Sequence, residues 1–242
     1  MKKEKIQDAA RSRILILDGA MGTAIQQYGL TEEAFRGEEF RGHSVPLKGD
    51  NDILNLTCPE VIREIHRAYI AAGADIITTN TFNSNAISQE EYRLTESVYR
   101  LNREGARIAR EEADAAEGGH TVYVAGSMGP TSRTLSLSPD ADRPEYRPVD
   151  FDTLAATYEE QSEGLIDGGA DLLLVETVFD GLNAKAALYA IERVQRRKRT
   201  ALPVMLSATV NDKSGRTLTG QSLDALYTAV AHYPLFAFGL NC

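Results

Sequence analysis

The sequence predicts an α/β protein built on a parallel sheet, and two observations carry this prediction. Apolar runs typical of strands alternate with segments of helical spacing along the whole chain, which is the pattern of a parallel sheet with crossover helices. Each apolar run also ends in small or polar residues. In a barrel of βα units these ends share one rim, where enzymes of that fold build their sites, whereas an open doubly wound sheet gathers only the ends beside its switch point.

Six apolar runs are the predicted strands, at residues 13–17, 75–79, 121–125, 171–175, 203–208 and 235–240. Their carboxyl ends carry, in order, Asp18-Gly19, Thr79-Asn80-Thr81, Gly126-Ser127, Glu176-Thr177, Thr209 and Asn241-Cys242. Six strands in 242 residues give about 40 residues per unit, so eight strands would need about 320 residues, against about 250 in a typical eight-stranded barrel. We therefore expect the last units of such a barrel to be missing from this chain.

The predicted helices lie between these strands, at residues 59–72, 90–117, 151–167, 182–197 and 222–231. The first of them has a start signal, Thr57 followed by Pro59. A short repeat, Gly-Ala-Asp at 73–75 and again at 169–171, places a glycine at the end of a helix and an aspartate at the start of a strand. Because no proline- or serine-rich linker divides the chain, we expect one domain over residues 13–242, preceded by an N-terminal extension at 1–12.

Composition and charge exclude several classes of function. Hydrophobic residues make up 43% and charged residues 25%, which is ordinary for a globular domain, and the net charge of −9 argues against a nucleic-acid partner. The basic cluster at 196–199 is expected to be the solvated end of a helix. We find no signal peptide and no apolar run of about 20 residues, and two cysteines exclude a disulfide framework. We expect a cytoplasmic protein that does not bind membranes.

The turn from Asp18 through Gly19, Ala20 and Met21 to Gly22 follows the first predicted strand and opens a helix. Backbone N–H groups in such a turn suit an anion, either a phosphate or an amino-acid carboxylate, although a tight turn that needs glycine is the alternative. The pattern is not the one that dinucleotide-binding proteins use.

Asp18 and Glu176 are the two acids that directly follow predicted strands. Because a buried carboxylate needs a partner, we expect them to bind a cationic group such as a substrate ammonium. The alternative is that each caps backbone N–H groups.

Histidines and lysines are absent from the predicted strand ends, which argues against a three-histidine metal site, a histidine base and a Schiff-base aldolase. Cys242 ends the sixth run. A lone cysteine there is either a small buried apolar residue or a reactive or metal-binding thiol. Cys58 directly precedes Pro59 at a helix start, and we treat it as incidental.

Several stretches, taken in order, resemble the homocysteine methyltransferases, and within them the first module of the cobalamin-dependent methionine synthases. Examples are Gly-Pro-Thr-Ser-Arg-Thr at 129–134 and Gly-Leu-Asn-Cys at the chain end. The matching stretches lie at residues 17–23, 79–83, 129–134 with 137–140, 176–180 with 182–185, 214–218 and 239–242.

This resemblance implies a TIM-type (β/α)8 barrel, of which about the first six βα units are present. It implies a zinc ion held by three cysteines, of which Cys242 matches the first, while a Cys-Cys pair after strand eight has no counterpart here. It also implies that Asp18 and Glu176 hold the amino group of homocysteine and that the N–H groups of Gly19, Ala20, Met21 and Gly22 take its carboxylate. Phe82 and Asn83 match positions near the substrate. One departure is Thr78, where such enzymes often carry a glutamate.

The implied reaction is the transfer of a methyl group from methylcobalamin to homocysteine, bound as a zinc thiolate, to give methionine. Zinc removes the thiol proton, so no histidine base is needed. The cobalamin would be carried by another module of the same or another chain, with residues 129–148 as a lid or docking surface, and we expect this chain alone to be inactive. Two alternatives stay open, a methyltransferase that uses betaine or S-methylmethionine, and a non-catalytic barrel fragment completed by another chain.

Overall fold

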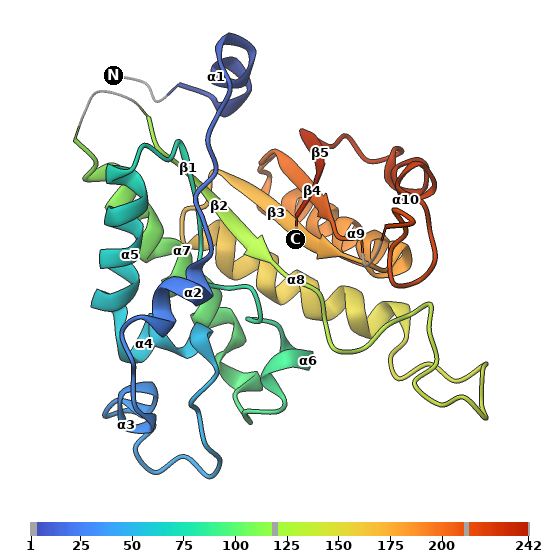
Figure 1. Ribbon diagram of the computed structural model, residues 1–242, viewed down its shortest axis with the longest axis horizontal. Coiled ribbons are helices and arrows are strands. Elements are labelled where there is room, and N and C mark those ends of the chain that lie inside the picture. Colours follow the sequence, from blue (N-terminus) through green and yellow to red (C-terminus); the bar gives the residue numbers. More distant parts are fainter. Residues whose placement is uncertain (1–3, 118–120, 211–212, 242) are drawn as a thin grey trace.

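The fold is known from a computed structural model that describes residues 4–117, 121–210 and 213–241. Its five parallel strands pair strictly in chain order (Figure 1). They are β1 (Ile76–Thr78), β2 (Tyr123–Met128), β3 (Leu172–Val178), β4 (Val204–Ala208) and β5 (Ala237–Leu240). A doubly wound sheet reverses its order at a switch point, whereas the wall of a βα barrel does not. Within the described ranges the order never reverses, so the sheet is of the barrel type.

The prediction of a strand at residues 13–17 is wrong, because this segment is extended beside the sheet but is not a regular strand. This segment makes a single bridge, between Leu17 and Ile76, and it runs beside β1 without a ladder of its own. The amide of Asp18 still donates to Ile76 O at 2.9 Å, and the amide of Ile76 donates to Ile16 O at 3.1 Å. Its partner β1 has only three residues and therefore offers little backbone for pairing. Ile14 is 90% exposed, so burial does not stabilise a longer strand here either.

The helices agree closely with the prediction except in one segment. Helices α5 (Pro59–Ala71), α8 (Phe151–Asp167), α9 (Gly181–Lys198) and α10 (Leu223–Val230) match the predicted bounds within one residue, and those of α8 match at both ends. The predicted helix at 90–117 is broken, because Arg93 adopts a left-handed conformation with φ of 54° that an α-helix does not allow. In its place are α6 (Ala86–Gln89), the 3₁₀ turn η2 (Thr95–Ser97) and α7 (Val98–Asp114).

The remaining elements all lie before β1. They are α1 (Ile6–Ser12), α2 (Met21–Gln26), α3 (Glu32–Arg36), the 3₁₀ turn η1 (Asn51–Ile53) and α4 (Leu54–Thr57). In Figure 1, α1 lies at the amino ends of the strands, and α2 to α4 lie toward their carboxyl ends.

The two faces of the sheet pack against different layers, as the two-residue period of a strand requires. Side chains on the outer face, such as Ile77, Leu173 and Leu206, pack in the clusters formed with α7, α8 and α9. Side chains on the inner face form a separate cluster that includes Ile6 and Ala9 of α1. The strand residues of that inner cluster are Ile76, Tyr123, Ala125, Leu172, Leu174 and the partly buried Met205. Helix α1, in the segment predicted as an extension, therefore covers the amino end of the inner face.

The two aspartates of the Gly-Ala-Asp repeat have the same structural role. Asp75 accepts hydrogen bonds from the amide of Ile16 at 2.9 Å and from Arg13 at 2.7 Å. Asp171 accepts from the amide of Val124 at 2.8 Å and from Arg110 at 2.7 Å. In both copies the hydrogen bonding is reciprocal. The amide of Asp75 donates to Ile16 O, and the amide of Asp171 donates to Val124 O. Each repeat thus joins the start of a strand to the segment that precedes it in the sheet.

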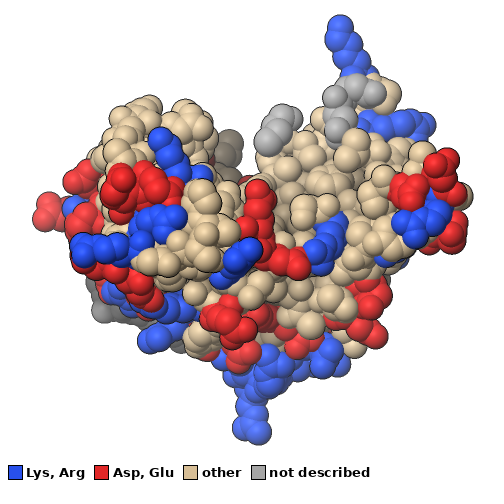
Figure 2. All heavy atoms as spheres, turned by 90° about the horizontal axis from the view of Figure 1, so that it is seen from below, with Lys and Arg blue, Asp and Glu red and all other residues tan. Residues whose placement is uncertain are grey.

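The basic cluster at 196–199 is confirmed as a helix end that is balanced by acids. Arg197 pairs with Glu163 at 2.9 Å, and Lys198 pairs with Asp167 at 2.8 Å, so both bind carboxylates of α8. Figure 2 shows basic and acidic side chains interspersed over the face seen from below. In the described part of the chain, no helix is both long enough and apolar enough to span a bilayer.

Replacing Asp75 by alanine is expected to lower the free energy of unfolding by about 2–3 kcal/mol, because the partly buried amide of Ile16 loses its acceptor and Arg13 loses its charged partner. Urea denaturation measures this change. Asp8→Ala is the matched control, since Asp8 forms only an exposed pair with Arg11 and its loss should leave the midpoint nearly unchanged. Equal effects of the two substitutions would contradict the role given to the repeat.

Candidate functional site

A layer of polar side chains lies on the inner face of the sheet, one step beyond the apolar cluster. Each member follows an inward apolar residue by two positions, so it points to the same face. Thr78 follows Ile76, Ser127 follows Ala125, Glu176 follows Leu174, and Ser207 follows Met205. The interior therefore changes from apolar at the amino ends of the strands to polar at their carboxyl ends, which is the end where barrel enzymes place their sites.

Asp18 lies beside this layer and is held by Thr78. The amide of Thr78 donates to Asp18 Oδ2 at 2.8 Å, and its hydroxyl donates to Asp18 Oδ1 at 3.0 Å. The pKa of Asp18 is raised to about 7, mainly by burial. The two hydrogen bonds from Thr78 lower this pKa, and the negative charge of Glu176 contributes to the rise. The two acids are 158 residues apart in the sequence, and both lie beside the inner face of the sheet at its carboxyl end, within the range at which their charges interact.

Glu176 is held by the neighbouring strand. The hydroxyl of Ser127, on β2, donates to Glu176 Oε1 at 2.5 Å, and burial raises the pKa of the carboxyl group. The pairing of β3 with β4 shifts register between Val175 and Val178, so Glu176 lies in a bulge. Bulges redirect side chains and are frequent beside functional sites.

The turn at 19–22 leads into α2 and is closely covered by Tyr69. The Tyr69 hydroxyl donates to the carbonyl of Ala20 at 3.2 Å, and a Cβ on Gly19 would lie 2.9 Å from Tyr69 Oη. Glycine at position 19 is therefore required by close approach. The negative charge of Asp18 contributes to a raised pKa of Tyr69, which places this side chain at the same site. The first N–H groups of α2 have no acceptor within the helix, as at any helix start.

Phe82 and Asn83 belong to the loop that follows β1. The carbonyl of Phe82 accepts a hydrogen bond from the amide of Gly129 at 3.1 Å, and a Cβ on Gly129 would lie 2.4 Å from that carbonyl. This contact fixes Phe82 against the end of β2. The side chain of Asn83 is exposed.

A second pair of acids, Asp50 and Asp52, lies buried beneath the same loop. Asp52 Oδ1 accepts from the amide of Asn83 at 2.9 Å and from the hydroxyl of Ser84 at 2.6 Å. Asp50 Oδ1 accepts from Gln89 at 3.1 Å. Burial raises the pKa of both acids, and the charge of Asp50 raises that of Asp52 further. These acids anchor the loop that carries Phe82 and Asn83.

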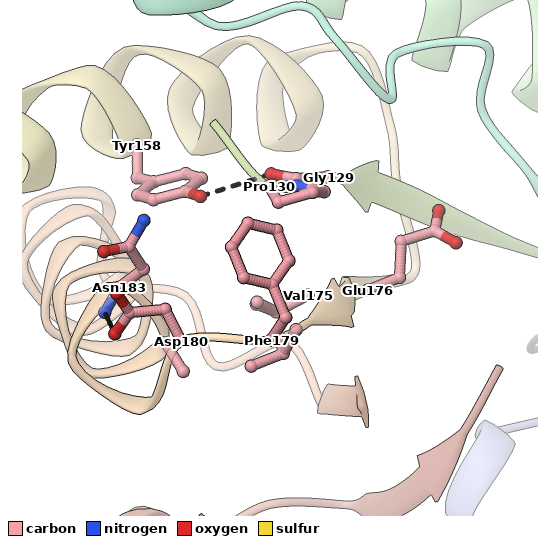
Figure 3. A pocket seen from close by; sticks show the side chains of 10 residues that line it. Gly129, Pro130, Tyr158, Val175, Glu176, Phe179, Asp180 and Asn183 are labelled. Carbon is pink, nitrogen blue, oxygen red and sulfur yellow. Dashed lines mark hydrogen bonds between the residues drawn. The ribbon is translucent and has the colours of Figure 1, made fainter. Parts of the chain in front are cut away.

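A small cavity lies on the outer side of β3, between the sheet and helices α8 and α9 (Figure 3). Phe179 and Tyr158 line it, and the Tyr158 hydroxyl donates to Gly129 O at 3.2 Å. Its volume of about 10 Å³ holds about one water molecule. Figure 3 shows the Glu176 carboxylate pointing away from the Phe179 ring. The cavity is too small for an amino acid, and Glu176 acts on the other side of the strand.

The long segment between β2 and α8 is tied to the start of α9. Asp180 accepts from the amide of Ser136 at 3.0 Å and from its hydroxyl at 2.7 Å, while it also caps α9 through the amide of Leu182. Asn183 accepts from the amide of Leu135 at 2.9 Å. The first part of this segment is therefore fixed beside the carboxyl end of β3.

The described residues do not form a metal site. Among them no three His, Cys, Asp or Glu side chains are placed to hold a metal ion. Cys242, the predicted ligand, lies outside the described residues. Cys58 is half-buried, with its thiol against Ala34 O at 3.3 Å and its side chain on the cluster beneath α2 and α3, which agrees with its treatment as incidental. Zinc would therefore need Cys242 together with ligands from beyond the described part of the chain.

A parallel sheet of βα units in unreversed order, with a polar, acid-bearing layer at the carboxyl strand ends, is the arrangement found in enzymes of the α/β-barrel class. The family model described as homocysteine S-methyltransferase matches residues 15–242. The chain belongs to the homocysteine S-methyltransferase family.

Three solved structures of the homocysteine methyltransferase MmuM from Escherichia coli are similar to this chain. The metallated form has 25% sequence identity and a TM-score of 0.74, covering 98% of this chain and 77% of that one. The oxidized form has 25% identity and a TM-score of 0.71, covering 95% and 73%. The apo form has 26% identity and a TM-score of 0.67, covering 95% and 72%.

Several residues of this site were not singled out from the sequence. Ser127 and Ser207 follow inward apolar residues by two positions, a signal that the sequence does contain. Tyr69 follows the apolar spacing of its helix, so the sequence does not distinguish it from core residues. The left-handed backbone of Thr177, with φ of 57°, has no local sequence signal, because threonine rarely adopts it.

Stability is expected to fall as the pH rises from 5 to 7. The folded pKa values of Asp18, Glu176, Asp50 and Asp52 all lie above their ordinary values near 4, so the folded chain holds protons that the unfolded chain has released. The stabilisation that these four protonated acids contribute to the folded state is fully present below pH 4. It is lost as the pH rises through their folded pKa values. Urea midpoints across this range should show a smaller decline for Asp18→Asn than for the wild type. An exposed control, Asp224→Asn, should keep the wild-type slope, and an unchanged slope in Asp18→Asn would refute the raised pKa.

Proposed function

We propose that this chain binds homocysteine and contributes to the methylation of its sulfur, which gives methionine. The observation that supports this most is the pairing of Asp18 and Glu176 at one rim, each held by a hydroxyl of the adjacent polar layer. Two neighbouring carboxylates repel each other, and a cation bound between them removes that repulsion. The ammonium group of an amino acid supplies one positive charge and up to three hydrogen-bond donors. Asp18 must lose its proton to receive it.

The carboxylate of homocysteine would bind the backbone N–H groups of Gly19, Ala20, Met21 and Gly22, at the start of α2. The close cover of Gly19 by Tyr69 keeps this turn in place. Phe82 and Asn83 would border the substrate from the loop after β1. Together these contacts orient the amino-acid end of the substrate and leave its thiol directed toward the end of β5, which leads into Cys242.

We further propose that Cys242 is one ligand of a zinc ion, with the other ligands supplied from outside the described residues. Zinc coordination would remove the proton of the homocysteine thiol and leave a nucleophilic thiolate. The sequence carries only one other cysteine, Cys58, which packs elsewhere. This chain by itself is therefore expected to be inactive.

The proposed methyl donor is methylcobalamin, carried by another module of the same or another chain. Residues 129–148, fixed to α9 by Asp180 and Asn183, stand beside the rim where such a module would approach. S-methylmethionine and betaine are the alternative donors. Assays that offer the three donors in turn to a complete barrel distinguish them.

We also propose that residues 13–242 belong to one eight-unit barrel and that residues 1–12 are an extension whose helix α1 covers its amino end. The apolar side chains along the segment at 13–17 support this, since Ile14, Ile16 and Leu17 are 90%, 59% and 42% exposed. Further βα units, from this chain's own gene product or from a second chain, would lie between β5 and this segment and cover them.

Isothermal titration with homocysteine tests the ammonium site. Asp18→Asn and Glu176→Gln are each expected to weaken binding by about 10- to 100-fold, because each removes a charged acceptor of the ammonium group. The exposed Glu91→Gln is the matched control. 4-Mercaptobutyrate, which lacks the ammonium group, should bind wild type and both variants with the same low affinity. If the variants bind homocysteine as tightly as the wild type, the assignment of these acids fails.

Elemental analysis of the purified, reduced chain tests the metal proposal. We expect well below one zinc per chain in the wild type, since Cys242 is a single ligand, and the same value for Cys58→Ser. About one zinc per chain, lost on Cys242→Ser, would show that the 242 residues or a second copy of them complete the site. In that case the need for ligands from elsewhere would have to be abandoned.

A further inference from the structure

The backbone of Thr177 is strained at the position directly after Glu176. Its φ of 57° lies in the left-handed region, which a β-branched residue adopts only when its surroundings enforce it. The residue lies in the β3 bulge between Val175 and Val178. Such a conformation is disfavoured in an isolated chain, so contacts elsewhere in the fold must hold it.

Those contacts come from one side chain, Asn241, which follows β5. Its Oδ1 accepts a hydrogen bond from the amide of Thr177 at 3.2 Å, and its Nδ2 donates to the hydroxyl of Thr177 at 2.8 Å. Asn241 Oδ1 also accepts from the hydroxyl of Ser207, on β4, at 2.9 Å. The Asn241 amide donates to Ala208 O at 3.0 Å, which fixes its own backbone. Both ends of the amide side chain are thus used to hold the strained residue.

Thr177 lies between Glu176 and Val178, and Val178 pairs with Ala208 of β4. The Glu176 carboxylate is held by the hydroxyl of Ser127. Because the strand is paired on both sides of the bulge, at Val175 and at Val178, a change of φ at residue 177 has to be absorbed within the bulge, and this would shift Glu176 and its carboxylate relative to Ser127. The position of Glu176 therefore depends on the side chain of Asn241, which lies two strands away from Thr177 and 64 residues after it in the sequence.

We propose that Asn241 is a positioning residue for Glu176, which acts by locking Thr177 in its left-handed conformation. This inference rests on the proposed function, in which Glu176 binds the ammonium group of homocysteine. Asn241 need not touch the substrate in this role. It orients the acid that does.

Homocysteine titration and thermal melting of four variants test the lock. Asn241→Ala is expected to weaken homocysteine binding about tenfold, because Thr177 relaxes and Glu176 loses its direction. Thr177→Gly should keep wild-type affinity, since glycine adopts a positive φ without strain. The double variant Asn241→Ala, Thr177→Gly should recover most of the lost affinity, even if its melting temperature stays low. The exposed Glu91→Gln, which lies outside the site, should have little effect.

The outcomes separate this inference from the proposed function. If the wild type binds homocysteine and Asn241→Ala binds it equally well, the lock is refuted while the ammonium site stands. If Asn241→Ala weakens homocysteine binding and the added Thr177→Gly does not restore the affinity, Asn241 contributes by some other route. The inference fails in that case too. A crystal structure of Asn241→Ala decides independently of any ligand. We expect residue 177 outside the left-handed region and the bond between Ser127 and Glu176 broken, and an unchanged backbone would overturn the proposal.

Discussion

The burial of two acids, Asp18 and Glu176, at the carboxyl ends of the strands is the constraint around which the rest of the site is arranged. Two carboxylates lie near each other in a half-buried setting, and burial raises the pKa of each. The fold partly offsets this with neutral donors, the amide and hydroxyl of Thr78 for one acid and the hydroxyl of Ser127 for the other. Hydroxyl groups stabilise a carboxylate without neutralising it. With the pKa of Asp18 raised to about 7, the charge of the site depends on its surroundings, which is typical of groups whose titration is shifted at a functional site.

These donors are available because of the way the strands are patterned. Each inward-facing series begins with apolar residues that pack on α1 and ends with a polar residue at the rim. Parallel pairing in strict chain order then brings Thr78, Ser127 and Glu176 onto neighbouring strands. Thr78 suits this arrangement because it is neutral and donates to Asp18. A third carboxylate at this point would add to the repulsion, whereas threonine donates to Asp18.

Local features, such as helix bounds, could be predicted from the sequence. Contacts between residues that are distant in the sequence could not. Helix α8 was predicted with its observed bounds from its helical spacing, and the structure shows an aspartate capping its start, where Asp150 accepts from the amide of Thr153. The break at Arg93 was missed, since a left-handed arginine has no sequence signal. Asp18 and Glu176 could be chosen because each follows an apolar run, and the structure brings them together as expected. The locking of Thr177 by Asn241 depends on two residues that are distant in sequence, so no local pattern could reveal it.

The position of helix α1 has a practical consequence for handling the protein. Helix α1 lies at the amino ends of the strands, opposite their carboxyl ends (Figure 1), and its Ile6 and Ala9 pack in the inner cluster of the sheet. An affinity tag or a surface linker attached ahead of this helix would emerge on the side of the molecule away from the rim. Immobilised through its N-terminus, the protein would present its ligand-binding end to the solution, and a bulky fusion partner there would leave the approach of a methyl donor unobstructed.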